Sequence, residues 1–99
     1  MKQLKVFLLI FLSCLLTLSV ASAQTLTVRG IVSDIYGEPI PGVNVLAKGT
    51  AAGTFTDVDG NYTLETDASA VLEFSSIGFR TVQVKAEGRA VINVSMETD

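Results

Sequence analysis

Between Thr25 and Met96, apolar and polar residues alternate at every second position, and turn-forming residues interrupt the alternation at short intervals. The uninterrupted runs are four to eight residues long and rich in β-branched or aromatic side chains, which is typical of strands with one buried face. No convincing helical period of 3.6 residues follows Gln24. The pattern predicts seven strands, at residues 26–33, 43–48, 53–56, 62–65, 71–75, 81–85 and 91–96.

Turn residues separate these strands. Tyr36–Gly42 contains both prolines of the chain, which cannot donate to a ladder and therefore lie at a sheet edge or outside it. Because each strand has one apolar face, two sheets must pack those faces together, and we expect a seven-stranded antiparallel sandwich. The predicted core consists of Val28, Val32, Val43, Val45, Tyr62, Leu64, Leu72, Phe74, Val82, Val84, Ile92 and Val94.

The N-terminus has a different composition from the rest of the chain. Lys2 and Lys5 precede an apolar run at residues 6–16, and Ala21-Ser22-Ala23 follows a short stretch that contains Thr and Ser. A basic region, an apolar region and a small-residue cleavage site in this order are typical of a helical secretory signal peptide. We expect cleavage after Ala23, which leaves Gln24 as the first residue of the mature chain.

Two other interpretations of this segment are weaker. The apolar residues 6–20 are fewer than the roughly 20 needed to span a bilayer, which argues against a permanent anchor. Lipidation of Cys14 needs a Leu or Val three residues earlier, where the sequence has Phe11. The sequence therefore predicts an exported chain, with residues 1–23 as the signal peptide and residues 24–99 as one domain.

Composition narrows the chemistry of that domain. The chain has no histidine, which excludes a Ser-His-Asp triad, a Cys-His pair and a His-ligated zinc site. Its one cysteine, Cys14, lies in the apolar N-terminal run. Residues 24–99 carry ten acidic and five basic side chains, and this net charge of −5 argues against nucleic acid or an anionic membrane surface as a partner. We expect no enzyme activity, no cofactor and no metal site.

Two groups of residues are candidates for binding. Asp57-Val58-Asp59-Gly60-Asn61 resembles the start of a calcium loop, but loop position 12 would be Ala68 instead of the required Glu. A turn stabilised by aspartate side chains is the better interpretation. Tyr36, Phe55 and Phe79 fall in or beside turns and are candidates for a partner or glycan surface, the alternative being that they close the ends of the sandwich.

Four segments resemble those of a known family. Val28–Asp34 and Gly37–Val45 resemble the V-x-G-x-V-x-D and G-x-P-L-P-G-V-x-V opening of carboxypeptidase-regulatory-like domains. Gly49–Tyr62 is similar to their K-G-T and G-T-x-T-D-x-D-G-x-Y core, and Leu72–Phe79 is similar to the L-x-F-S-x-x-G-Y/F that follows. The resemblance covers nearly all of residues 25–98 in the same order, and it implies a prealbumin-like Greek-key sandwich.

This variant most resembles the N-terminal extension of SusC/RagA-type TonB-linked outer-membrane receptors, which import glycans or peptides. The resemblance implies a non-catalytic interaction module on the periplasmic side of the outer membrane, with a protein partner in the receptor machinery. An exposed strand edge is one place where a partner strand would add. Since the family's TonB box would begin near Asp99, we expect either a truncated receptor or a free-standing copy of the domain. The alternative function is a secreted carbohydrate-binding or adhesion module.

Overall fold

The computed structural model describes residues 3, 5–10 and 24–99, of which residues 3 and 5–10 are helical. Seven strands follow, as the alternation predicted: β1 Thr25–Asp34, β2 Asn44–Ala47, β3 Gly53–Phe55, β4 Asn61–Asp67, β5 Val71–Ser75, β6 Val82–Lys85 and β7 Val94–Met96. In the part of the chain that the structure describes, no helix is long and apolar enough to cross a membrane. Of the predicted cleavage site, Ala23 lies outside the described residues, and Gln24 precedes β1.

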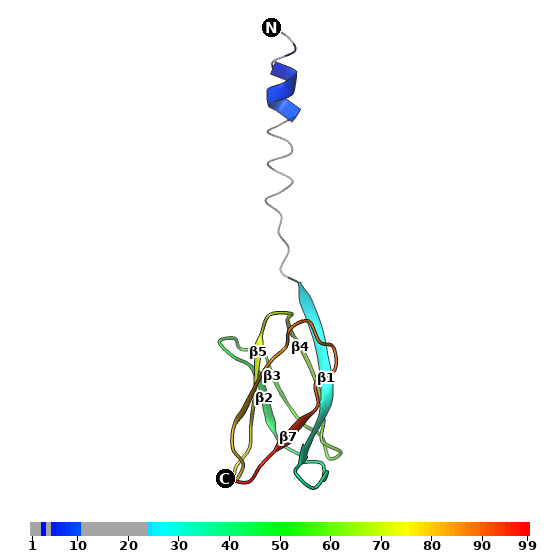
Figure 1. The fold of residues 1–99 in the computed structure, drawn as a ribbon, viewed down its shortest axis with the longest axis vertical. Coiled ribbons are helices and arrows are strands. Elements are labelled where there is room, and N and C mark those ends of the chain that lie inside the picture. The colour runs from blue at the N-terminus through cyan, green and yellow to red at the C-terminus, as the bar shows by residue number, and fades with distance from the viewer. Residues whose placement is uncertain (1–2, 4, 11–23) are drawn as a thin grey trace.

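The strands form two sheets that pack face to face, which confirms the predicted all-β sandwich (Figure 1). One sheet has the order β4-β1-β7 and the other the order β3-β2-β5-β6. All pairs are antiparallel except β1 and β7, which pair in parallel from Val32↔Val94 to Asp34↔Met96. The chain reverses direction at each of the six connections between strands, so β7 runs in the same direction as β1 and must pair with it in parallel.

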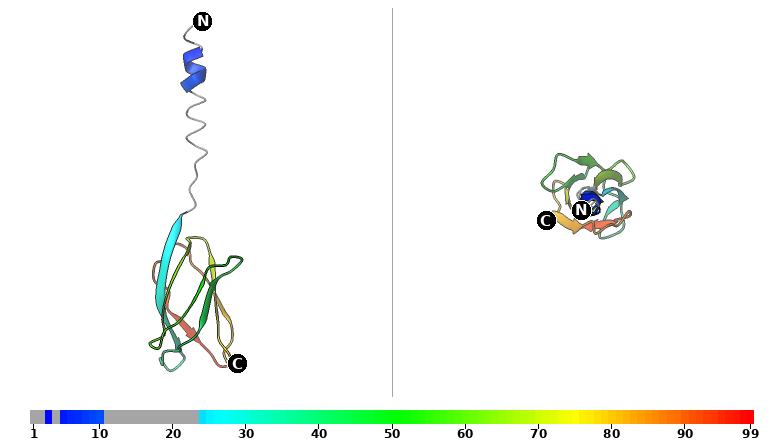
Figure 2. Two further views of the ribbon diagram at one scale, coloured as in Figure 1. Left: turned by 180° about the vertical axis from the view of Figure 1, so that it is seen from behind. Right: turned by 90° about the horizontal axis from the view of Figure 1, so that it is seen from above.

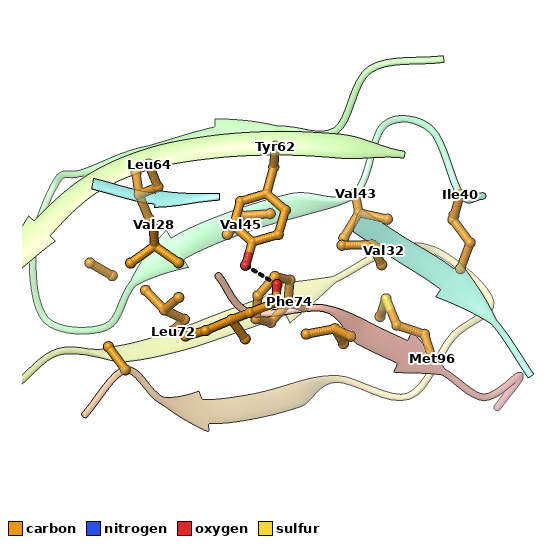
Figure 3. Packing of buried hydrophobic residues seen from close by; sticks show 14 residues of the cluster. Val28, Val32, Ile40, Val43, Val45, Tyr62, Leu64, Leu72, Phe74 and Met96 are labelled. Carbon is orange, nitrogen blue, oxygen red and sulfur yellow. Dashed lines mark hydrogen bonds between the residues drawn. The ribbon is translucent and has the colours of Figure 1, made fainter. Parts of the chain in front are cut away.

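The core lies between the sheets and contains ten of the twelve predicted residues (Figure 3). Val82 and Val84 are only half-buried, because β6 is the edge strand of its sheet. Four buried hydrophobic residues of the described core were not predicted: Ile40, Ala47, Ala86 and Met96. Three of these lie at the end of a strand or just beyond it, where a loop closes over the core.

Tyr62 joins three parts of the sandwich. Its ring meets the Phe74 ring of the opposite sheet edge-on, at 5.4 Å between centroids and an interplanar angle of 76°. Its hydroxyl donates a 2.6 Å hydrogen bond to the Ile92 carbonyl, shown as the dashed line in Figure 3. Burial raises the pKa of Tyr62 to about 12, although the nearby positive charge of Arg89 acts in the opposite direction.

The Ile92 carbonyl is available to Tyr62 because the pairing between β1 and the segment before β7 is interrupted there. The Ile31 N–H donates instead to the side-chain oxygen of Asn93, at 3.0 Å. Gly30 makes the arrangement possible, since a Cβ at that position would lie 1.9 Å from the Ile92 oxygen. The interruption explains why β7 begins at Val94, three residues later than the predicted strand.

We predict that Gly30→Ala destabilises the fold by about 2–4 kcal/mol, because the added methyl group must displace the Ile92 carbonyl and its hydrogen bond to Tyr62. Gly53→Ala is the matched control. Gly53 is also a strand glycine, but its Cβ would meet atoms no closer than 3.3 Å, so we expect a cost below about 1 kcal/mol. Urea unfolding of both variants measures the difference, and equal costs would contradict the assigned role of Gly30.

The raised pKa of Tyr62 predicts that the stability of the fold depends on pH. In the unfolded chain the hydroxyl ionises at its ordinary pKa of 10.0, whereas in the folded chain its pKa is about 12. Rising pH therefore stabilises the unfolded state first, and about 2–3 kcal/mol of stability is lost between these two values. Tyr62→Phe should cost about 1–3 kcal/mol at neutral pH but remove this loss at high pH.

Denaturant unfolding across that pH window tests the prediction. Tyr36→Phe is the control, because Tyr36 is 85% exposed and has no hydroxyl contact among the described residues. It should leave the alkaline loss of stability unchanged. An alkaline loss of the same size in Tyr62→Phe and the unsubstituted chain would show that Tyr62 is not its source.

Candidate interaction surface

The aspartates of the recognised motifs are part of the turns. One oxygen of Asp34 accepts hydrogen bonds from the N–H groups of Tyr36 and Glu38, at 2.8 and 3.0 Å. One oxygen of Asp57 accepts from Asp59 and Asn61 in the same manner, both at 2.9 Å. These contacts confirm the interpretation of residues 57–61 as an aspartate-stabilised turn. In the described ranges, no three His, Cys, Asp or Glu side chains come together as a metal site.

Thr56 closes the segment that contains the prolines. Its buried hydroxyl donates to the Ile40 carbonyl at 2.7 Å and accepts from the Val43 N–H at 2.9 Å. The hydroxyl thereby satisfies two backbone groups that the irregular path around Pro39 and Pro41 would otherwise leave unpaired. Like one carboxylate oxygen each of Asp34 and Asp57, the Thr56 hydroxyl therefore supports the fold by binding backbone groups.

The three aromatic candidates lie at the same end of the sandwich but differ in exposure. Tyr36 is in the β1–β2 loop and is 85% exposed, and Phe55, the last residue of β3, is 68% exposed. Phe79, in the β5–β6 loop, is half-buried and packs against the core. The structure thus leaves Tyr36 and Phe55 open to a partner, while Phe79 closes one end of the core. A glycan or partner surface at these residues stays a prediction.

Exposed apolar side chains gather at this end. We call it the loop end: it comprises the last residues of β1, β3 and β5, the loops that follow them and the C-terminal residues, which lie together in Figures 1 and 2. Of the seven large hydrophobic residues exposed within residues 24–99, five belong to it: Ile35, Tyr36, Phe55, Val58 and Ile77. The other two, Ile31 and Val91, lie on or beside β1. Clustered exposed apolar residues are typical of an interaction site.

A shallow hollow of about 440 Å³ lies at the loop end, lined by Gly42, Asn44, Ser75, Ser76 and Ile77. Asn44 pairs across the sheet with Ser75 on one side and with the exposed Phe55 on the other, so Phe55 is the cross-strand neighbour of a residue that lines the hollow. Ile77 is fully exposed. The lining thus combines small and polar residues with one exposed apolar side chain, Ile77, and holds no charged residue, which suits a protein side chain better than a charged substrate.

The two lateral flanks of the sandwich differ in how their strand edges are protected. On the β6 flank, the Arg89 guanidinium donates to the Lys85 carbonyl, and the Arg80 N–H donates to the Glu97 carbonyl. On the opposite flank, β4 pairs only with β1 and β3 only with β2 in the described sheets, so one edge of each strand is open. An open edge is where a partner strand can add.

Sequence reasoning found Tyr36 and Phe55 but missed Ile35, Val58 and Ile77. A signal for them was present, because each is a large apolar residue inside a turn segment, where polar residues are the rule. The other residues that line the hollow gave no such signal. Gly42 and Ser76 meet there only because β2 and β5 are neighbours in the sheet.

Comparison with known proteins agrees with this architecture. The family model of the CarboxypepD_reg-like domain matches residues 28–99. TonB-dependent receptor P3 of Formosa agariphila is 43% identical over 99% of this chain, and TonB-dependent receptor SusC of Bacteroides thetaiotaomicron is 39% identical over 96% of it. TonB-dependent receptor P39 of Formosa agariphila is 38% identical over 94% of it.

The matches cover nearly all of this chain but only a small part of each relative. The chain spans only 9–10% of the length of these three receptors, so the likeness concerns one domain of a much larger protein. The matched region contains all seven strands except the first three residues of β1. Fold, motif residues and family model coincide, and the chain belongs to the CarboxypepD_reg-like domain family, in the form found in TonB-dependent receptors.

Proposed function

We propose that the chain is an exported, non-catalytic protein-interaction module that acts at the periplasmic face of the outer membrane in the context of a TonB-dependent receptor. The observation that carries the proposal is the match to such receptors over almost the whole chain, at 38–43% identity. At this identity the relatives share the same sandwich, which in them is part of a TonB-dependent receptor.

The structure supports a binding role over a catalytic one. The polar motif residues Asp34, Thr56 and Asp57 are engaged in turn hydrogen bonds. Tyr62, whose pKa is shifted, uses its hydroxyl to hold the Ile92 carbonyl inside the core, away from solvent. Two kinds of surface remain for a partner, the apolar loop end and the open edges of β3 and β4. Both suit protein contacts.

Export is the first testable part of the proposal. We predict that the full chain, expressed with its own N-terminus, is recovered from the periplasm with Gln24 as its first residue, because Ala21 and Ala23 form the cleavage site. The mass of the purified chain, measured by mass spectrometry, shows whether residues 1–23 have been removed. Ala23→Asp should block cleavage, and Ala51→Asp, at an exposed loop position, serves as the control. Recovery of the uncleaved chain from the cytoplasm would contradict the proposal.

A chimeric receptor tests the role itself. The matched segment of the Bacteroides thetaiotaomicron receptor is replaced by residues 24–99 of this chain, and uptake of that receptor's substrate is compared with uptake after deletion of the segment. Since the two segments share 39% identity and one fold, we expect the chimera to restore uptake several-fold over the deletion.

Immunoblots of outer-membrane fractions establish that all receptors are present in equal amounts. Normal uptake by the deletion, or no recovery by a chimera that reaches the membrane in normal amounts, would contradict the proposed role.

A further inference from the structure

Ile77 and Phe55 are the most informative exposed residues of the loop end. Both are large and apolar: Ile77, in the β5–β6 loop, lines the hollow, and Phe55, at the end of β3, lies across the sheet from the lining residue Asn44. Burial of apolar surface stabilises by about 25 cal/mol per Å², so leaving these side chains in water forgoes that gain. Because five of the seven large apolar side chains exposed within residues 24–99 lie at the loop end, a segment that covers this end would bury the most apolar surface.

The C-terminal residues pair with the segment that directly follows Ile77. The Asp99 N–H donates to the Gly78 carbonyl at 2.9 Å, and the Arg80 N–H donates to the Glu97 carbonyl at 2.9 Å. A bridge between Phe79 and Thr98 lies between these two contacts. The chain after residue 99 in a receptor-length protein would therefore start next to the loop that carries Ile77.

Charge restricts what can cover the hollow. The loop end carries six acidic side chains, namely Asp34, Glu38, Asp57, Asp59, Glu97 and Asp99, and one basic side chain, Arg80. Arg80 lies 3.7 Å from the Glu97 carboxylate and 4.0 Å from that of Asp99, and is thus already shared between two acids. A second copy of the chain would bring two acidic ends together. A segment with an apolar side chain flanked by Lys or Arg is the complementary occupant.

We propose that the hollow beside Ile77 receives an apolar side chain from the polypeptide that directly follows this domain in a receptor-length chain. The proposal rests on the proposed function, because it takes the receptor context from the relatives, which are about ten times longer. A short tether gives an effective concentration in the millimolar range, so even a weak contact is well populated. Docking would set the position of the sandwich relative to the receptor.

The experiment uses the full chain extended after Asp99 by the segment that follows the matched region in the Bacteroides thetaiotaomicron receptor. A second protein carries the same residues in scrambled order. Amide hydrogen exchange of residues 76–80 is measured in both. We expect the native-order extension to slow exchange there about ten-fold, as a contact of roughly 0.1 mM affinity at millimolar effective concentration predicts.

Ile77→Asp should abolish this protection, because it places a charge where the apolar side chain packs. Val91→Asp is the matched control: Val91 is also exposed and apolar, but it pairs with Arg29 away from the loop end, so the protection should persist. Equal protection by the scrambled extension, protection that survives Ile77→Asp, or protection that rises with protein concentration would overturn the proposal. The chimera result is separate, since restored uptake without protection would remove this inference and leave the proposed function standing.

Discussion

The sandwich depends on how the backbone carbonyl of Ile92 is accommodated in the core. The Ile92 oxygen lies where a side chain of residue 30 would be, and the Tyr62 hydroxyl satisfies it with a 2.6 Å hydrogen bond. An unpaired carbonyl at this depth would cost about 1–3 kcal/mol, a large share of the roughly 4–11 kcal/mol expected for a domain of this size. Tyr62 also packs edge-on against Phe74, so one side chain both satisfies the turned carbonyl and joins the two sheets.

This constraint gives several of the motif residues a structural role. Gly30 and Tyr62 face each other in the β1–β4 register and together accommodate the Ile92 carbonyl. Asp34, Asp57 and Thr56 organise the turns at the loop end. The family signature thus describes how the sandwich is built. The exposed side chains of the loop end, among them Tyr36, Phe55 and Ile77, are the ones that we propose for binding.

Much of the architecture could be predicted from the sequence, because the alternation of apolar and polar residues is visible within each short segment. It located all seven strands and ten core residues, including Phe74 and Tyr62. The half-burial of Val82 and Val84 did not follow, since it depends on β6 being an edge strand, which is a property of the sheet order. The interrupted pairing near Asn93 could not be predicted from the alternation either. It accompanies a contact between residues 62 and 92, which are distant in sequence.

The candidate surface was predictable only in part, for a similar reason. Tyr36 and Phe55 were recognisable as aromatic residues near turns, but the exposure of each depends on its neighbours in space, and Phe79 turned out to pack against the core. The hollow beside Ile77 requires β2 and β5 to be adjacent.

The central claim is that Gly30 and Tyr62 act on the same carbonyl. A double-mutant cycle with Gly30→Ala, Tyr62→Phe and the combined variant measures it most directly, by urea unfolding at neutral pH. If the added methyl group already breaks the Tyr62 hydrogen bond, the combined variant loses at least about 1 kcal/mol less stability than the sum of the two single changes. Strict additivity of the two single changes would contradict this account.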